Sequence, residues 1–395
     1  MKMISYNTGL NLSAGRAIRT LTTNTSSKYV LSLFVSMNCN AFGLTEAQSV
    51  GMGGTGVVSG TFVSAPYFNP ALSSIYRTTD NAAFLGPTFT TTATSLGNFV
   101  SNLSDASNAI ENDEDPNDSL IALDGSSLTL NTSIGMAFAV PNSTAGISAY
   151  TSIYSIDTIQ PEIKYDLFGN PNEDSSLIKT KSVKIKELGL ALSRYASIGH
   201  QHFTFGVTPK LQTITTYTYQ SRVDRFNLDD IKENKNSSFL INFDAGLLWF
   251  YGPLRIGVSS KNIRNKQFST TAVENLWGGH KEQDVYELSR TSTVGLGIVG
   301  DTGTFSLDYD LNEREGYLNT NDNTRYLRVG MESQYILRSI RLRFGYYDNL
   351  ANEEEKASLT TGAALILFNV IQTDVALTYS RKQTAGFSAN FTLNF

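Results

Sequence analysis

The last eleven residues, 385–395, read Ala-Gly-Phe-Ser-Ala-Asn-Phe-Thr-Leu-Asn-Phe. From residue 387 onward, apolar side chains occupy every second position, and serine, threonine or asparagine occupies each position between them. Because successive side chains of a β-strand point to opposite faces, this stretch predicts a strand with one apolar face and one polar face. The same pattern recurs at residues 128–140, 203–212, 305–312 and 340–347.

Alternation and turn residues together predict about fourteen strands after residue 81, and therefore an all-β chain. The expected strands are residues 82–94, 126–140, 144–159, 179–196, 202–220, 237–251, 253–263, 284–300, 303–312, 324–337, 339–348, 358–368, 370–381 and 385–395. In a soluble β-sandwich the apolar faces of such strands would pack against each other. In a membrane barrel they would face lipid, and the polar faces would line the lumen.

The connections between these strands alternate in length. Long connections follow the first six odd-numbered strands, at about residues 95–125, 160–178, 221–236, 264–283, 313–323 and 349–357. The connections after the even-numbered strands are short, and so is the last connection, at 382–385. Long external loops and short periplasmic turns are typical of outer-membrane barrels, so the pattern favours a transmembrane antiparallel β-barrel in the outer membrane of a Gram-negative bacterium. An even strand number would leave both termini in the periplasm.

Aromatic side chains near the ends of the predicted strands would suit the girdles at the two membrane interfaces. The alternative is that they are ordinary core aromatics. The residues concerned are Tyr150, Tyr217, Tyr219, Trp249, Tyr251 and Tyr335.

The composition excludes several other classes of protein. Of the 395 residues, 41% are hydrophobic and 17% charged, against roughly 25% charged in ordinary soluble domains. A helical membrane protein is excluded because no stretch of 18 apolar residues exists. A net charge of -5 argues against a nucleic-acid partner, and the abundant aromatics argue against disorder. A soluble, secreted all-β protein remains the alternative to a barrel.

The N-terminal region predicts an export signal. Residues 28–41 combine a lysine, a short apolar core and a small-residue end, which is typical of a secretory signal peptide cleaved after Ala41. Residues 1–27 are long for the first region of such a signal, and an over-extended gene start would account for them; a buried strand of a soluble fold is the alternative. Cys39, the single cysteine, falls within residues 1–41, so the mature chain would lack disulfides and thiol chemistry.

Residues 42–81, between this leader and the barrel of residues 82–395, predict a plug. Glycine permits close backbone approach, and Asn-Pro marks a turn. A plug folded within the barrel mouth needs both, and the motif is Gly51, Gly53, Gly54, Gly56, Asn69, Pro70 and Ala71. The glycines lack the lysine and the strand–helix context of a phosphate-binding loop. The combination resembles the N-terminal hatch of the FadL-type (OMPP1/TodX) transporters.

Short strand-like motifs extend the resemblance over most of residues 43–395. They resemble the conjugal transfer TraF proteins of the outer-membrane type, at residues 243–250, 254–262, 307–311, 326–332 and 340–346. The resemblance implies a FadL-like barrel, and we expect a passive channel for small compounds, hydrophobic ones among them. The alternative is a structural or assembly component of conjugal transfer or another envelope machine.

The end of the chain also resembles a known signal. Terminal Phe395, preceded by alternating Leu393, Phe391 and Phe387, is similar to the sorting signal of bacterial outer-membrane proteins. The expected partners are therefore outer-membrane lipid and the barrel-assembly machinery, besides a small hydrophobic ligand or proteins of the conjugation or envelope machinery.

Several charged residues are predicted to point into the lumen. The principal ones, on three neighbouring strands, are Asp308, Asp310, Arg328, Glu332, Arg341 and Arg343. Opposite charges on adjacent strands can pair. Such a network could hold the hatch, in which case Arg341→Ala should change channel conductance, or the charges could merely neutralise each other. Lys210, Asp244, Arg255 and Asp374 are expected to point inward as well.

Nothing in the sequence indicates an enzyme, a cofactor or a metal. No nucleophile–base pair is identifiable. The histidines are His200, His202 and His280, the first two in a predicted turn. Residues 111–118 are acidic but lack the glycine and glutamate of a calcium loop. Just before them, Phe99, Leu103, Ala106 and Ile110 have helical spacing and predict a short amphipathic helix at the barrel mouth.

Overall fold

A computed structural model describes most of the chain after the predicted leader. The described residues are 46–75, 81–94, 96–112, 114–142, 144–226, 234–274, 281–318, 323–335, 339–352, 357–380 and 384–395. The predicted signal peptide (1–41), Cys39 and His280 lie outside them, as do residues 42–45 and 76–80 of the predicted hatch.

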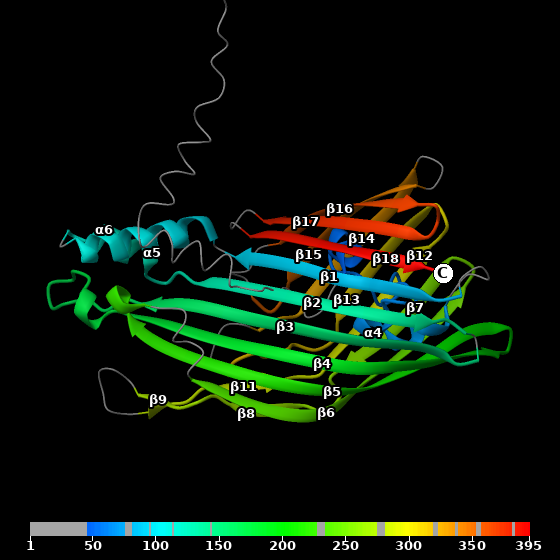
Figure 1. Cartoon of the computed structure of the whole chain (residues 1–395), viewed down its shortest axis with the longest axis horizontal. Coiled ribbons are helices and arrows are strands. Elements are labelled where there is room, and N and C mark those ends of the chain that lie inside the picture. The colour runs from blue at the N-terminus through cyan, green and yellow to red at the C-terminus, as the bar shows by residue number, and fades with distance from the viewer. Residues whose placement is uncertain are drawn as a thin grey trace, which may run out of the picture.

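Fourteen antiparallel strands close into one barrel, as the alternation predicts (Figure 1). The first strand, β1, pairs with the last, β18, so that Ala83 lies opposite Asn394 and the sheet has no edge. In chain order the wall strands are β1 (Ala83–Thr94), β2 (Leu128–Val140), β3 (Gly146–Glu162), β4 (Leu177–Ile198), β5 (Gln201–Arg222), β6 (Lys235–Tyr251), β7 (Leu254–Lys261), β12 (Thr291–Val299), β13 (Gly303–Asp310), β14 (Tyr326–Tyr335), β15 (Ile340–Asn349), β16 (Ser358–Leu367), β17 (Ile371–Ser380) and β18 (Ala385–Asn394).

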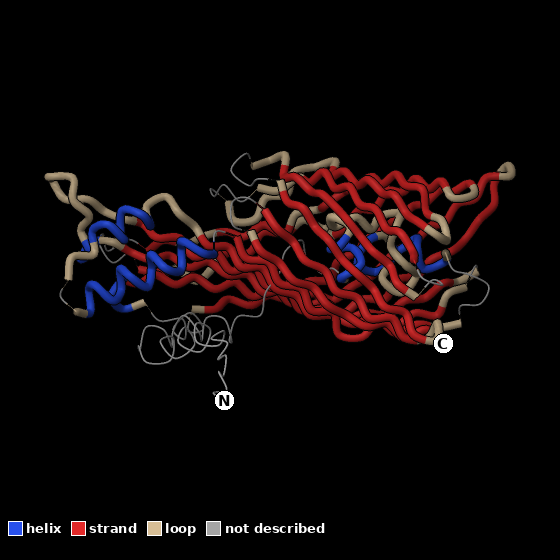
Figure 2. Tube along the Cα trace, turned by 90° about the horizontal axis from the view of Figure 1, so that it is seen from above, coloured by secondary structure: helices blue, strands red, loops and turns tan. Residues whose placement is uncertain are grey.

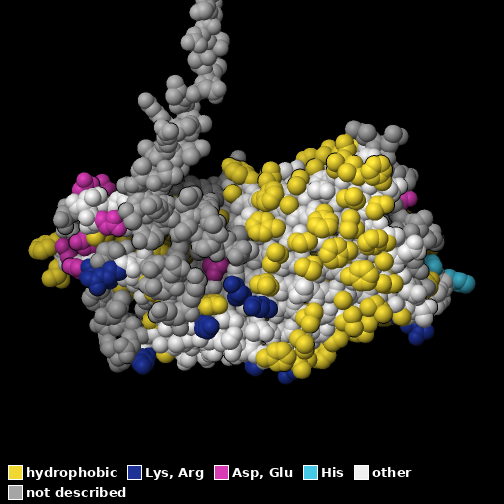
Figure 3. All heavy atoms as spheres, in the orientation of Figure 1, with side chains coloured by type: hydrophobic (Ala, Val, Ile, Leu, Met, Phe, Trp, Pro, Cys, Tyr) yellow, Lys and Arg dark blue, Asp and Glu magenta, His cyan; other side chains and the backbone are white. Residues whose placement is uncertain are grey.

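The outer face of the barrel is apolar over a broad band (Figure 3). Large hydrophobic side chains on it are solvent-exposed, among them Ile134, Phe138, Leu190, Phe205, Ile241, Leu296, Phe344 and Leu377. The alternate positions of the same strands are buried and mostly small or polar. This arrangement inverts that of a soluble protein and fits a wall whose outer face meets lipid. It excludes the soluble sandwich, in which these faces would pack together.

The prediction for the eighth strand, residues 284–300, was wrong at its beginning. The wall strand starts at Thr291, and residues 285–288 form a separate strand, β11 (Val285–Leu288), which pairs with β8 (Lys266–Ser269). Burial explains the departure, because Tyr286 and Leu288 pack into a hydrophobic cluster on the inner face of β3–β6. The two-residue strands β9 (Val273–Glu274) and β10 (Lys281–Glu282) lie in the same connection.

Two helices cover the end of the barrel where the long connections gather (Figures 1 and 2). They are α5 (Leu96–Glu111), at the position that the helical spacing predicts, and α6 (Asn117–Leu123). Phe99 and Ala106 of α5 are buried in a cluster with Leu128, Leu130 and Ile178. The helices therefore cover apolar strand ends that extend beyond the lipid-facing band. Short 3-10 helices η2 (Glu173–Ser175) and η3 (Val223–Arg225) lie in neighbouring connections.

None of the helices in the described segments is both long and apolar enough to cross a bilayer.

The segment before β1 lies inside the barrel, in the half that contains the C-terminus (Figure 2). It consists of α3 (Ala47–Gly51), α4 (Ala65–Phe68) and η1 (Pro70–Ser74). Helix α3 contacts β15–β18, and η1 contacts β3–β6, so the segment reaches opposite parts of the wall. We call residues 46–75 the hatch.

Candidate functional site

Glycines allow the hatch backbone to lie directly on the wall. Gly53 has a φ of +70°, and a Cβ on it would lie 2.6 Å from the carbonyl oxygen of Tyr346. On the wall side, a Cβ on Gly345 would overlap the backbone nitrogen of Gly53. Backbone meets backbone here, which any side chain would prevent. Of the other motif glycines, Gly51 ends α3, Gly54 also has a positive φ, and Gly56 packs under the Phe68 ring.

Asp308 of β13 binds the glycine loop. Its Oδ2 accepts hydrogen bonds from the backbone nitrogens of Gly56, at 2.8 Å, and Val57, at 3.0 Å. Asp308 is 2% exposed, so both bonds are shielded from water. A carboxylate that accepts two buried N–H groups forms charge-assisted bonds, which are stronger than neutral ones.

Other wall side chains hold further points of the hatch backbone. Thr360 Oγ1 accepts from Gly53 N at 2.9 Å and donates to Gly51 O at 3.1 Å. The remaining contacts are Asn390 Oδ1 with Ala47 N (2.8 Å), Arg255 Nη1 with Val58 O (3.0 Å), Ser259 Oγ with Phe68 O (2.5 Å) and Lys261 Nζ with Tyr67 O. The hatch is therefore attached to wall strands around the lumen.

The Asn-Pro-Ala motif connects the two halves of the hatch. The Asn69 side chain caps η1 by accepting from Ala71 N at 3.1 Å, and Pro70 occupies the first turn of that helix. Asn69 Nδ2 also donates to Val57 O at 3.1 Å. One buried side chain thus fixes the glycine loop relative to η1.

The other predicted lumen charges pair mainly with each other. Arg328 binds Asp310 through two bonds of 2.8 and 3.0 Å. Arg343, fully buried, binds Glu332 at 2.6 Å and Asp374 at 2.7 Å, and Arg341 approaches Glu332 at 3.8 Å. Among the six predicted residues and within the described segments, Asp308 alone forms a hydrogen bond to the hatch. The ion pairs of the other five are with each other or with Asp374.

Glu46, just before α3, is buried near the charges of Asp374, Arg343 and Glu332. It is 3% exposed, and its Oε1 has no hydrogen-bond partner among the described residues. Burial raises the pKa of its carboxyl to about 7; the Ser64 hydroxyl opposes this rise, and the negative charge of Asp374 adds to it.

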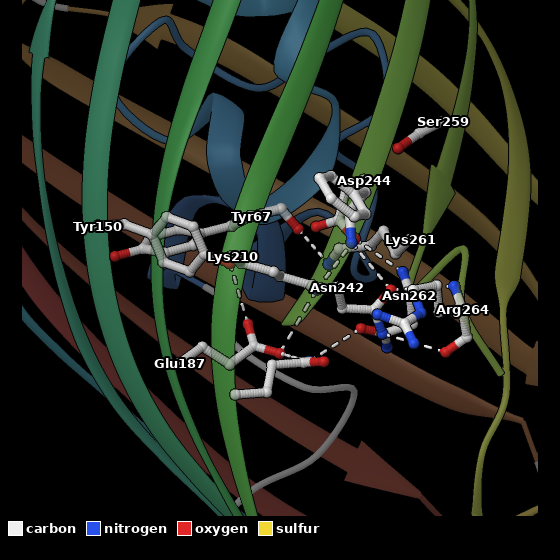
Figure 4. A network of polar contacts seen from close by, with 12 residues as sticks. Tyr67, Tyr150, Glu187, Lys210, Asn242, Asp244, Ser259, Lys261, Asn262 and Arg264 are labelled. Atoms are coloured by element: carbon white, nitrogen blue, oxygen red, sulfur yellow. Dashed lines mark hydrogen bonds and ion pairs between the residues drawn. The ribbon is translucent and has the colours of Figure 1, made fainter. Parts of the chain in front are cut away.

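A second buried charge cluster lies across the lumen (Figure 4). Lys210 pairs with Asp244 at 2.9 Å and Glu187 at 3.5 Å, and both Lys210 and Asp244 have side chains only 2% exposed. Glu187 also accepts from Gln212 Nε2 at 2.5 Å and from the Tyr150 hydroxyl at 3.1 Å. Sequence alternation places Lys210 and Asp244 inward, but Glu187 and Tyr150 were missed. Glu187 lies at an inward position of its strand, so the same alternation could have identified it.

Tyr150 corrects one prediction. It does not belong to an interface girdle: it is 4% exposed and packs edge-to-face on Tyr67 of the hatch, with ring centroids 5.5 Å apart. Tyr219 is also buried, whereas Tyr251 and Tyr335 are exposed on the outer side.

A cavity of about 110 Å³ separates the hatch from the connections above it. Its walls combine aromatic rings with the two charge clusters. The lining residues are Gly54, Val57, Pro66, Tyr67, Phe68, Tyr150, Tyr154, Glu187, Lys210, Lys261, Asn262, Thr291, Thr293, Asp308, Asp310, Arg314, Thr324, Tyr326 and Arg328.

The barrel wall beside the hatch is irregular at one place. The pairing of β1 shifts register against both β18 and β2 after Leu85, where Gly86 and Pro87 form a bulge. Pro87 has no N–H to contribute to the ladder. Behind the bulge, Leu85 packs in one apolar cluster with Phe62, Val63 and Phe68 of the hatch.

The C-terminal residues lie on the outer face at the seam of the barrel. Phe387, Phe391 and Phe395 are exposed, Leu393 less so, and the Phe391 ring lies against Gly86. Phe395 N donates to Ala82 O at 2.9 Å, which extends the closure of β18 on β1.

The histidines of the short β4–β5 turn show no metal site. His202 Nδ1 shares a 2.6 Å hydrogen bond with the Tyr195 hydroxyl, and its ring stacks on Phe250. In the described segments no group of three or more His, Cys, Asp or Glu is placed to hold a metal ion.

Solved structures with the same fold are transporters and channels. The Ralstonia pickettii toluene transporter TbuX matches with a TM-score of 0.57 at 14% identity, over 90% of this chain and 100% of that one. The Pseudomonas putida toluene transporter TodX gives 0.52 at 11%, over 90% and 98%. A Pseudomonas aeruginosa FadL homologue gives 0.53 at 10%, over 91% and 100%. At these identities the likeness establishes a shared fold, that of a closed β-barrel.

The sequence comparison identifies the family. No curated protein matches this chain. The family model described as "F plasmid transfer operon, TraF, protein" matches residues 66–310, more than half of the chain, from the second half of the hatch to the end of β13. By that match, this protein belongs to the F plasmid transfer operon TraF family.

Proposed function

We propose that the protein is a passive outer-membrane channel for small hydrophobic compounds. The observation that carries the proposal is the aromatic-walled cavity beside a hatch that lies inside the barrel. The hatch contacts opposite parts of the wall, and the cavity beside it offers a site in which a small molecule can leave water. Solved barrels of this fold are described as toluene transporters and as a monoaromatic hydrocarbon channel, which agrees with such a cargo.

The bulge in β1 supports a lateral route out of the cavity. The apolar cluster of Phe62, Val63, Phe68 and Leu85 connects the hatch to the bulge at Pro87, and Phe68 also lines the cavity. A molecule following this path stays among apolar side chains until it reaches the wall. Because the ladder is weakest at the bulge, we place the exit there.

The arrangement of the chain ends supports an orientation of the barrel in the membrane. We propose that both termini are periplasmic, because Phe395 and the start of β1 meet at the barrel end with the short turns. The long connections with α5 and α6 would then face outward. We further propose that the barrel-assembly machinery reads the C-terminal strand, and that lipid surrounds the apolar band.

Uptake into proteoliposomes tests the channel. Wild-type protein should admit toluene faster than empty vesicles do. Thr291→Trp places an indole in the cavity and should abolish the difference, whereas Ile298→Trp on the same strand, at an exposed lipid-facing position, should not. Equal uptake with wild-type protein and with empty vesicles would contradict the proposed channel function.

The family description favours a second candidate, a structural or assembly component of conjugal transfer. Deletion of the gene should then lower the mating frequency, and Thr291→Trp should restore mating as well as wild type does, because cargo is irrelevant to this role. Normal mating and normal envelope partners in the deletion strain would exclude it.

A further inference from the structure

The polar groups that line the cavity above the hatch differ in whether they already have hydrogen-bond partners. The carboxylates in its lining are already bound. Asp310 accepts from Arg328, Thr293 and Tyr326 N, and Glu187 accepts from Lys210, Gln212 and Tyr150. Asp308 binds the hatch through Oδ2; its buried Oδ1 has no hydrogen-bond partner among the described residues and is directed at the wall, 2.7 Å from where a Cβ on Gly295 would lie.

Two cations in the lining are not paired in this way. Lys261 donates to the Tyr67 carbonyl oxygen, and Arg314 Nε donates to Thr324 Oγ1 at 3.2 Å. In the described part of the chain, neither comes within ion-pair distance of a carboxylate. Two carboxylates, Asp244 and Glu187, interact electrostatically with Lys261 at longer range. Both form their ion pairs with Lys210.

A third donor lies unused in the same wall. The Tyr67 hydroxyl has no hydrogen-bond partner among the described residues, although the side chain is 2% exposed. An unpartnered buried hydroxyl is costly unless something binds it. The cavity therefore has three groups with unused donors, two of them cationic, beside the aromatic pair Tyr67 and Tyr150, whereas its unpartnered acceptor, Asp308 Oδ1, faces the wall.

We propose that this cavity binds a small aromatic carboxylate, with its carboxylate held by Lys261 and Arg314 and its ring against Tyr67 and Tyr150. The inference rests on the proposed channel function and adds single-ring acids to its cargo. A volume of about 110 Å³ accommodates one ring and no long chain. A carboxylate supplies the acceptors that the donors lack.

Ligand binding to the purified, folded full-length barrel tests the site, with benzoate and benzyl alcohol as matched probes. Wild-type protein should bind benzoate at least about tenfold more tightly, since hydrogen bonds to charged groups contribute roughly 1.5–3 kcal/mol. Lys261→Met should abolish this preference and Lys261→Arg should keep it. Lys164→Met, at a half-exposed surface lysine, is the control and should change nothing. Arg314→Met replaces Lys261→Met if that variant lacks the heat-modifiable migration of a folded barrel.

The outcomes separate this inference from the channel itself. Equal affinity for the two probes in wild-type protein, or a preference that survives both Lys261→Met and Arg314→Met, overturns the carboxylate site. Toluene uptake equal to that of empty vesicles overturns the channel instead, whatever benzoate does.

Discussion

Removing the Asp308 carboxylate should release the hatch without unfolding the barrel. Asp308→Ala leaves the backbone nitrogens of Gly56 and Val57 without the acceptor that now lies 2.8 and 3.0 Å away. Leaving a buried N–H unsatisfied costs about 1–3 kcal/mol, so the two together weaken hatch attachment by roughly 2–6 kcal/mol. The lower figure corresponds to about a thirtyfold rise in the population of the released hatch.

Hydrogen exchange at the amides of Gly56 and Val57 measures this population directly. Their exchange should accelerate at least about thirtyfold in Asp308→Ala, whereas amides in the centre of β13 should be unaffected. The exchange rate in Asp308→Asn should lie between those of the wild type and Asp308→Ala, because an amide oxygen still accepts both bonds but carries no charge. Arg341→Ala is the matched control: Arg341 approaches Glu332 and not the hatch, so its loss should spare these amides. Unchanged exchange in Asp308→Ala, or equal acceleration in Arg341→Ala, would refute the reasoning.

Three further predictions concern the hatch contact, its charge and the seam. Gly345→Ala puts a methyl group where Gly53 N now lies, so the hatch should become protease-sensitive while heat-modifiable migration persists; a resistant hatch contradicts the packing. Burial raises the pKa of Glu46 to about 7 from 4.5, so its contribution to hatch closure, up to about 3 kcal/mol, is complete below pH 4.5 and lost as the pH rises through 7. Exchange at Gly56 should therefore accelerate between pH 4.5 and 7, beyond the intrinsic pH dependence, and this excess should level off above pH 7; Glu46→Gln should remove it, and an excess that persists in Glu46→Gln assigns it to another group. Phe395→Ala should reduce the yield of folded barrel in outer membranes, whereas Phe368→Ala, 92% exposed in a short turn at the same end, should not; equal yields would argue against a C-terminal signal.

The alternation of side chains predicts the wall well because lipid and lumen impose it on every strand. It cannot tell what covers an outward side chain. Leu128 and Leu130 continue the outward series of Ile134 and Phe138, yet α5 and α6 cover them and lipid does not. It also fails where a segment gains more by packing than by pairing, as at 285–288, which leave the wall for the inner cluster.

The candidate site was less predictable for a related reason. Alternation indicates that Asp308 and Arg343 point inward, but not that one binds the hatch and the other binds Glu332 and Asp374. That difference depends on the register between strands and on where the hatch stops, and neither has a local sequence signal. Tyr150 shows the same limit, because an aromatic residue near a strand end suits a girdle or a lumen equally well until its partner Tyr67 is known.

The inward face of the wall changes character along the barrel axis, and this change restricts how the hatch can move. On β4, β6 and β14, an inward-facing glycine lies beside the hatch or beside Tyr150. The inward-facing residue two positions nearer the long connections is charged. On β5, the glycine and the charged residue are four positions apart. The pairs are Gly246 and Asp244, Gly330 and Arg328, Gly189 and Glu187, and Gly206 and Lys210. Two residues of strand span about 6.7 Å.

A hatch that slid toward the cavity by that distance would exchange backbone contacts at glycines for collisions with buried, paired charges. The wall therefore allows one seated position and resists axial sliding in that direction. Opening must begin by breaking contacts at the wall, such as the two bonds to Asp308. In the proposed channel, Phe68 lies on the route from the cavity to the bulge and packs against Gly56, so we expect release of the glycine loop to limit transit. The substitution that speeds exchange at Gly56 should therefore speed uptake.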